Sequence, residues 1–260
     1  MNIYCLQMDI AWEDKAANFT KVHKMLQQSA VQPGSLVILP EMFATGFSMN
    51  KCGIGLDEPD RTETFLSNTA REFGVFLLGG LVSLAENDKG RNTCLVCDPE
   101  GNTIAHYQKI HPFTYGGETE HYIPGKKITL FEWDSFTVAP FICYDLRFPE
   151  IFRHAVQQGA NLFCVIACWP AARQEHWLAL LKARAIENQA YVAAVNRVGT
   201  DPKLAYAGRS QIIDPQGQIL ADGGEIETAI HTSLDYAALQ QYRQAFPALG
   251  DIRHDYIYSQ

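Results

Sequence analysis

Apolar runs alternate with amphipathic, helix-like segments over most of the chain. Near the N-terminus, the apolar runs IYCLQM, SLVILP and VFLLGGLVSL predict strands that are covered on both faces. The segments AANFTKVHKMLQQSA and TETFLSNTAREFG, which lie between them, have apolar residues at helical spacing. The second helix is predicted to end at Gly74, because glycine readily adopts the conformation that closes a helix.

The centre of the chain has a more β-like pattern. The sequences DPEG at 98–101 and DPQG at 214–217 each lie between two strand-like runs and predict hairpins. Further predicted strands are FTVAPFICYD, NLFCVIACWP and YVAAVNRVG, and further predicted helices are PEIFRHAVQQG and HWLALLKARAIENQ. We expect residues 1–260 to form one α/β domain, with one large mixed sheet or two packed sheets and helices outside. The aromatic and charged segment at about 233–260 is expected to lie over the surface or at a subunit interface.

Composition narrows the class of protein. Hydrophobic residues make up 47% and charged residues 19% of the chain, as in ordinary globular domains. The net charge of -8 disfavours nucleic acid or an anionic membrane as a partner. Asp9 and Glu13 interrupt the N-terminus where a secretory signal needs an apolar run, and no apolar stretch is long enough to span a membrane. Seven cysteines, several inside apolar runs, favour reduced thiols in a cytoplasmic protein.

Candidate chemistry follows the predicted strands. Functional groups in open α/β sheets collect just beyond the carboxyl ends of strands. Glu41 follows SLVILP, Lys109 follows TIAHYQ and Cys143 follows FTVAPFI, while Trp169 and Arg173 follow NLFCVIAC. Each of the first three also has an ordinary interpretation, as a loop carboxylate or helix cap, a surface lysine and a small core residue.

The setting of Cys143 distinguishes it from the other cysteines. ICYDLRFPE passes from strand to tight turn to helix, and Pro149 suits the first helical position. Unpaired backbone N–H groups at such a turn favour a thiolate and can bind an oxyanion. Cys164 lies inside an apolar run and is interpreted as core, and the Cys94–Cys97 pair lacks the second ligand pair of a zinc site. A thiol hydrolase needs a base and oxyanion donors, which glutamate and lysine can supply without histidine.

Three segments also resemble a known family. LPEMF around Glu41, YQKIHPF around Lys109 and ICYDLRFPE around Cys143 resemble, in order, the signature segments of the nitrilase superfamily of carbon–nitrogen hydrolases. The similarity continues through WPAAR and ARAIENQ and is greatest to the ω-amidase branch, which hydrolyses the terminal amide of 2-oxoglutaramate and related ω-amides. The resemblance implies a four-layer αββα sandwich, with two mixed sheets between outer helices, which usually pairs into a homodimer.

The resemblance also implies a role for each site residue. Cys143 attacks the amide carbon and forms a thioester, and Glu41 is the general base. Lys109 and the backbone N–H of Tyr144 hold the oxyanion. Glu118 matches a second, supporting glutamate, although Glu120 is close enough to compete for that assignment. No metal or organic cofactor is implied.

Residues on the substrate side have open alternatives. Arg173 can pair with a substrate carboxylate or lie at the surface as an ordinary helix-start residue. Tyr115 and Trp169 are candidate pocket walls or core residues, and Arg147 is either a site residue or a partner of Glu150 one helical turn away. Residues 187–188 are expected to serve packing or a subunit interface.

The function also has alternatives within and outside catalysis. Another amidase or an N-carbamoyl hydrolase of the same superfamily would keep the reaction class and change the substrate. An inactive binding protein that retains the fold would usually have lost a residue of the triad, whereas Glu41, Lys109 and Cys143 are all present.

Overall fold

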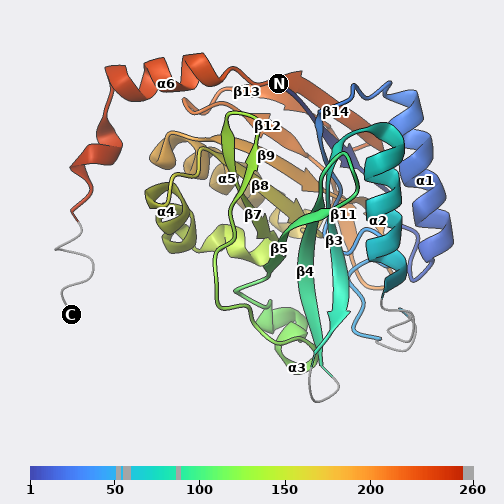
Figure 1. The fold of residues 1–260 in the computed structure, drawn as a ribbon. Helices are drawn as coiled ribbons and strands as arrows, with labels where there is room; N and C mark the ends of the chain where they lie inside the picture. The colour runs from blue at the N-terminus through green and yellow to red at the C-terminus, as the bar shows by residue number, and fades with distance from the viewer. Residues whose placement is uncertain (51–53, 55–59, 86–88, 254–260) are drawn as a thin grey trace.

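The computed structural model describes residues 1–50, 54, 60–85 and 89–253, which form two six-stranded mixed sheets packed face to face (Figure 1). The first sheet has the order β14-β1-β2-β3-β4-β5 and the second has the order β13-β12-β9-β8-β7-β6. A separate two-stranded sheet joins β10 and β11. The strands of the first sheet are β1 (Asn2–Gln7), β2 (Leu36–Ile38), β3 (Phe76–Leu84), β4 (Gly90–Cys97), β5 (Thr103–Gln108) and β14 (Thr228–Ser233). The strands of the second sheet are β6 (Phe131–Trp133), β7 (Phe136–Ile142), β8 (Leu162–Ala167), β9 (Tyr191–Asn196), β12 (Gln211–Ile213) and β13 (Ile219–Asp222). The two-stranded sheet consists of β10 (Val198–Thr200) and β11 (Ala205–Ala207).

Helices cover the outer face of each sheet, so the predicted four-layer αββα sandwich is confirmed (Figure 1). Helices α1 and α2 pack on the first sheet through residues such as Leu26 and Leu66, and α4 and α5 pack on the second through Phe152 and Leu181. The helices are α1 (Lys15–Gln28), α2 (Asp60–Phe73), α3 (Glu118–His121), α4 (Pro149–Gln157), α5 (Gln174–Asn188) and α6 (Tyr236–Ala245). Short 3₁₀ segments are η1 (Thr114–Gly116), η2 (Cys143–Arg147), η3 (Ala171–Arg173) and η4 (Ala248–Asp251).

Both predicted hairpins are present. β4 pairs antiparallel with β5, and β12 pairs antiparallel with β13. In each turn an aspartate, Asp98 or Asp214, accepts backbone N–H groups, and a glycine, Gly101 or Gly217, has a positive φ. Gly74 also has a positive φ and follows α2 directly, as predicted.

Cysteines predicted to be structural lie in the core. Cys164 lies on β8 and is fully buried, as are Cys5 and Cys94 of the opposite sheet. All three thiols belong to the continuous hydrophobic cluster between the sheets. The cluster also holds many buried valine, leucine, isoleucine and phenylalanine side chains, each of which contributes roughly 1.5–3 kcal/mol, so the interior gives the site at the sheet edge a rigid base.

The topology brings the candidate site residues to one edge of the sandwich. β1, β2 and β3 are parallel, and two antiparallel pairings return β5 to the same direction. β7, β8 and β9 are likewise parallel. The carboxyl ends of β2, β5, β7 and β8 are followed by Glu41, Lys109, Cys143 and Cys168, which explains why residues far apart in sequence meet.

The C-terminal part of the chain runs along the outside of the sandwich. β14 pairs with β1, so the first and last strands of the described chain lie side by side in one sheet. Within α6, Leu239 is the buried residue, and Arg243 Nε donates to the carbonyl of Gln189 at 2.8 Å. This agrees with a surface position for the described part of 233–260; its end, 254–260, lies outside the described residues, and contact with a second subunit stays a prediction.

Candidate active site

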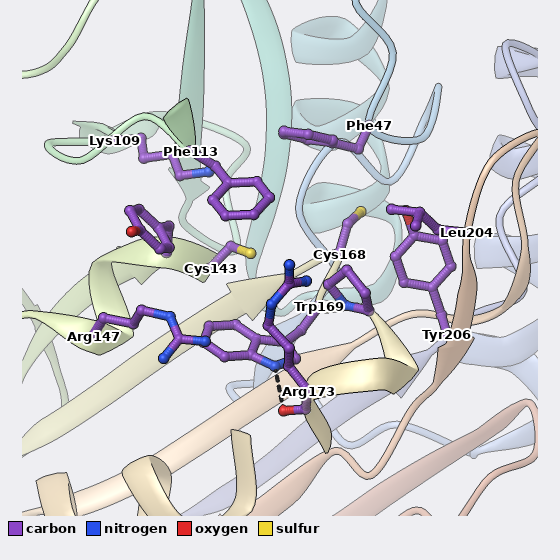
Figure 2. Close-up of a pocket in the computed structure, with 12 residues that line it drawn as sticks. Phe47, Lys109, Phe113, Cys143, Arg147, Cys168, Trp169, Arg173, Leu204 and Tyr206 are labelled. Atoms are coloured by element: carbon purple, nitrogen blue, oxygen red, sulfur yellow. Dashed lines mark hydrogen bonds between the residues drawn. The ribbon is translucent and has the colours of Figure 1, made fainter. Parts of the chain in front are cut away.

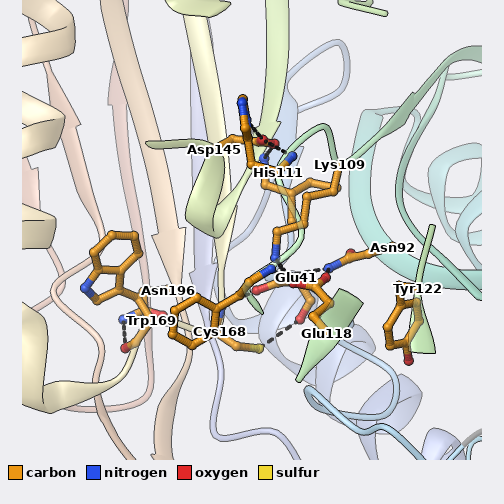
Figure 3. A network of polar contacts seen from close by, with 12 residues as sticks. Glu41, Asn92, Lys109, His111, Glu118, Tyr122, Asp145, Cys168, Trp169 and Asn196 are labelled. Carbon is orange, nitrogen blue, oxygen red and sulfur yellow. Dashed lines mark hydrogen bonds and ion pairs between the residues drawn. The ribbon is translucent and has the colours of Figure 1, made fainter. Parts of the chain in front are cut away.

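Lys109 lies between two buried carboxylates. Its Nζ is 2.9 Å from Glu41 Oε1 and 2.8 Å from Glu118 Oε2, and all three side chains are almost inaccessible to water (Figure 3). Burial alone would lower the pKa of Lys109, but the negative charges of Glu118 and Glu41 outweigh it and raise the pKa well above its usual range. Lys109 is therefore an ammonium group. Glu118, and not the exposed Glu120, is the second glutamate of this cluster.

Each oxygen of Glu41 has a different set of partners. Oε1 accepts from Lys109 and from Asn92 Nδ2, the latter at 2.6 Å. Oε2 accepts from the backbone N–H of Cys168 at 2.8 Å. Because carboxylate oxygens can each accept two hydrogen bonds, Oε2 retains a position at which it can take a proton.

Cys143 occupies the first position of η2, directly after β7. Its φ is +48°, which is uncommon for a residue with a side chain and marks a constrained turn. Burial, together with the charge of Glu41, raises the pKa of the thiol well above its usual range, and Lys109 offsets this only in part. These surroundings favour the neutral thiol, whereas the turn alone is expected to favour a thiolate, so attack on an amide requires a base.

Asp145 ties the Cys143 turn to the segment that carries Lys109. Its fully buried carboxylate accepts from Ile142 N–H at 3.1 Å, Tyr107 OH at 2.7 Å and His111 N–H at 3.0 Å. These bonds join the ends of β7 and β5, which belong to different sheets, and so fix the thiol relative to the ammonium group.

The thiol opens into a pocket that is also lined by Lys109, by aromatic side chains and by two arginines (Figure 2). Phe47, Phe113, Trp169 and Tyr206 are among the aromatic lining residues. Trp169 is nearly buried, and its Nε1 donates to the carbonyl of Arg173 at 2.8 Å. Of its two expected positions, pocket wall or core, the structure places it in the pocket wall.

Two arginines lie at the mouth, on either side of Trp169 (Figure 2). The guanidinium of Arg147 stacks 4.9 Å from the centre of the Trp169 ring, and its Nη2 is 3.1 Å from His176 Nδ1. Arg147 thus turns towards the pocket, as a site residue does. The guanidinium of Arg173 lies over the rings of Phe113 and Tyr115.

Tyr115, the other candidate wall residue, lies in a different position from Trp169. It is 85% exposed and lines an outer vestibule, not the pocket around Cys143. Arg173 lines both spaces, which places it between the vestibule and the thiol. Glu187 and Asn188 contact Arg184 on α5, in agreement with a packing role.

Several residues of the site had no clear signal in the sequence. Asn92 lies near the start of β4, where no motif marks it. Cys168 follows an apolar run as other buried cysteines do, and its sequence gives no sign that its backbone N–H donates to Glu41. Asp145 belongs to the ICYDLRFPE segment but could be assigned no partner. Within the described ranges, no cluster of three or more histidine, cysteine, aspartate or glutamate side chains is arranged to bind a metal ion.

Comparison with known proteins agrees with this geometry. The family model described as "Carbon-nitrogen hydrolase" matches residues 3–244. The chain belongs to the carbon–nitrogen hydrolase family. Its membership of the nitrilase superfamily, predicted from the three segments, is confirmed.

Relatives of this carbon–nitrogen hydrolase span nearly its whole length. The chain is 40% identical to "Omega-amidase YafV" of Yersinia enterocolitica, over 96% of both chains. It is 36% identical to "2-oxoglutaramate amidase" of Bacillus subtilis, over 97% of this chain and 98% of the relative. The structure of XC1258 from Xanthomonas campestris, a CN-hydrolase superfamily protein with an arsenic adduct in its active site, matches with a TM-score of 0.89 at 35% identity over 97% of both chains.

The family and its relatives make this chain an enzyme, an amidohydrolase. This confirms the reaction class expected from the sequence. In the part of the chain that the structure describes, no helix is long and apolar enough to cross a membrane.

Proposed function

We propose that this carbon–nitrogen hydrolase cleaves the terminal amide of small dicarboxylate monoamides, such as 2-oxoglutaramate, through a thioester on Cys143. The observation that carries the proposal is a pocket lined by a thiol, a buried ammonium group and two arginines. Relatives at 36–40% identity are named for the same activity. The thiol explains amide cleavage, and the arginines explain a preference for a substrate that carries a carboxylate.

Acylation begins with proton transfer from Cys143 to Glu41. The sulfur attacks the amide carbon while Oε2 of Glu41, the oxygen with a free acceptor position, takes the thiol proton. The Lys109 ammonium has three N–H bonds, of which two go to Glu41 and Glu118. The third is available for the oxyanion, together with the backbone N–H of Tyr144. Glu41 then gives its proton to the leaving nitrogen, and ammonia departs.

Deacylation uses the same groups in the second half of the cycle. Glu41 removes a proton from water, which attacks the thioester carbon, and Lys109 again stabilises the oxyanion. Collapse of this intermediate breaks the carbon–sulfur bond, and the proton held by Glu41 returns to the Cys143 sulfur. The product is a carboxylic acid, and the thiol is ready for another cycle.

Arg173 and Arg147 bind the end of the substrate that does not react. A guanidinium group can bind a carboxylate with two parallel hydrogen bonds. Both arginines rest on aromatic rings, which limits their freedom before the substrate binds. The amide is then directed to Cys143 and the carboxylate to the mouth of the pocket.

Ammonia release from a matched substrate panel tests the proposal. We expect rapid release from 2-oxoglutaramate and glutaramate, slow release from a neutral amide of similar length, and none from the Cys143→Ala variant. Inactivity on every ω-amide would reject the proposed substrate class. Release from N-carbamoyl compounds instead would identify an N-carbamoyl hydrolase.

A catalytically inactive binding protein would behave differently in a labelling experiment. An active site of the proposed kind should allow iodoacetamide to alkylate Cys143 in the folded protein at neutral pH. Labelling of the cysteines only after denaturation would support the inactive alternative.

Three further expectations belong to the same proposal. Residues 1–260 would act as one domain, pair into a homodimer with the segment at about 233–260 near the interface, and work in the cytoplasm. Support for a reducing compartment comes from the six described cysteines, which are all free thiols.

A further inference from the structure

Asn92 is a buried residue of β4 that faces both catalytic carboxylates (Figure 3). Its Nδ2 donates to Glu41 Oε1 at 2.6 Å and to Glu118 Oε1 at 2.9 Å. A side-chain amide has two N–H bonds, so each carboxylate receives one of them. Together with Lys109, Asn92 closes a ring of hydrogen bonds in which two donors alternate with two carboxylates.

The strand pairing explains why Asn92 meets Lys109. In the β4–β5 register, Thr93 lies opposite Gln108, and the next bond of the ladder runs from the N–H of Lys109 to the carbonyl of Asn92 at 2.9 Å. Facing residues on paired strands hold their side chains close together. The backbone thus fixes one member of the ring against the other.

The chemistry of the amide also fixes its orientation. A flipped amide would point Oδ1 at two carboxylates, which accept hydrogen bonds and cannot donate to it when ionised. With Nδ2 towards the carboxylates, Oδ1 is buried and has no hydrogen-bond partner among the described residues. The orientation with Nδ2 towards the carboxylates is therefore the one that makes both hydrogen bonds.

We propose that Asn92 is a positioning residue that holds the side chains of Glu41 and Glu118 in place and leaves Glu41 Oε2 as the atom that takes the Cys143 proton. Asn92 and Lys109 occupy both acceptor positions of Oε1. The single N–H of Cys168 orients Oε2 without filling it. This inference rests on the proposed function, because it assumes that Glu41 is the base.

Other titratable groups surround Glu41, and their charges affect the same proton transfer. They are Lys109, Glu118, Tyr122, Cys143 and Cys168. Among the described residues around Glu41, Asn92 is the uncharged group that donates to both carboxylates. Its removal leaves the net charge of the site unchanged and isolates the effect of the two hydrogen bonds.

Alkylation of Cys143 tests the inference without any substrate. The rate of its reaction with iodoacetamide is measured from acidic to alkaline pH in the wild type, Asn92→Leu and Asn92→Ala, with the labelled cysteine identified by peptide mass spectrometry. We expect both variants to move the half-maximal rate to higher pH by about one unit, because each loses a donor to a charged acceptor. Asn92→Ala tests the same point if Asn92→Leu does not fold.

Asn161→Ala is the matched control. Asn161 is also buried, and its Oδ1 accepts a hydrogen bond from the N–H of Thr137. It directly precedes β8, at the end of that strand that lies away from Cys143. Its loss should lower Tm and leave the alkylation profile in place. Unchanged profiles in both Asn92 variants, or an equal shift in Asn161→Ala, would overturn the inference.

The two proposals fail in different ways. If the wild type releases no ammonia from the amide panel but the Asn92 variants still shift the alkylation profile, the substrate class is wrong and the role of Asn92 stands. If ammonia is released and the profiles do not move, Asn92 has only a structural role.

Discussion

In the proposed mechanism Glu41 acts as a base although it already accepts three hydrogen bonds. Its partners are Asn92, Lys109 and the N–H of Cys168. These donors stabilise the carboxylate and hold it in place, and the neutral thiol of Cys143 supplies the proton. The reactivity of Cys143 therefore depends on Glu41, which takes its proton as the sulfur attacks.

Glu41→Gln should remove this activation while preserving the size of the side chain. General bases contribute about 10²–10⁴-fold to rate, so we expect kcat/KM for ω-amides to fall by about that factor. Glu120→Gln is the control, because Glu120 is exposed and lies close in sequence to the buried Glu118. Retention of most activity in Glu41→Gln would assign the base to another carboxylate.

Arg173 should affect binding more than chemistry. Its guanidinium lies between the outer vestibule and the pocket of Cys143. Arg173→Met keeps much of the apolar stem and removes the charge, so KM for a carboxylate-bearing amide should rise about tenfold or more, as a lost charge-assisted hydrogen bond implies. Hydrolysis of a neutral amide should change little, and equal losses on both substrates would point to a structural role.

At the level of elements, β3 supports the loop that carries Glu41. Gly80 exchanges backbone hydrogen bonds with this loop, donating to the carbonyl of Pro40 and accepting from the N–H of Phe43, both at 3.2 Å. A Cβ at Gly80 would lie 2.6 Å from Met42 N and 2.7 Å from Glu41 Cα. Because backbone atoms surround this position, only glycine allows the two segments to approach so closely.

Gly80→Ala should therefore displace the Glu41 loop. Overpacking of a tight site typically costs about 1–3 kcal/mol, and we expect a comparable loss of unfolding free energy together with a lower kcat. Urea unfolding and ammonia release measure the two effects. Gly250→Ala, where a Cβ meets no atom within 4 Å, should leave both unchanged. Wild-type kcat in Gly80→Ala would show that the loop tolerates the shift.

Sequence patterns predicted the elements that contain long apolar runs and missed those that depend on partners. The strands before Glu41 and Cys143 could be predicted because both faces are buried and the apolar runs are continuous. β5, before Lys109, has several exposed positions and is indicated instead by the hairpin turn at 98–101. β10 and β11 are short and form a separate two-stranded sheet, and α6 buries little more than Leu239, so these elements have no strong pattern. Asn92 could not be predicted, because its role arises from a cross-strand neighbour and two distant carboxylates.

At the level of the whole molecule, many ionisable side chains are buried in neutral form. Burial raises the pKa of Cys5, Cys94 and Cys164 between the sheets, and of Tyr107 and Tyr122 near the site. In the unfolded chain these thiols lose their protons near pH 8.5 and the phenols near pH 10. The folded protein keeps these protons at higher pH, so over this range it binds more of them than the unfolded chain.

Stability should consequently fall as pH rises above about 8. The free energy of unfolding decreases by about 1.4 kcal/mol per pH unit for each proton that only the folded state retains. Lys109, whose pKa is raised by Glu118 and Glu41, adds to this loss only above about pH 10.4, where the unfolded lysine also deprotonates. Urea unfolding at intervals from pH 7 to 10 measures the slope. Cys94→Val removes one buried thiol and should reduce the slope by about one proton, whereas a free energy that stays constant up to pH 10 would show that these thiols ionise in the folded protein.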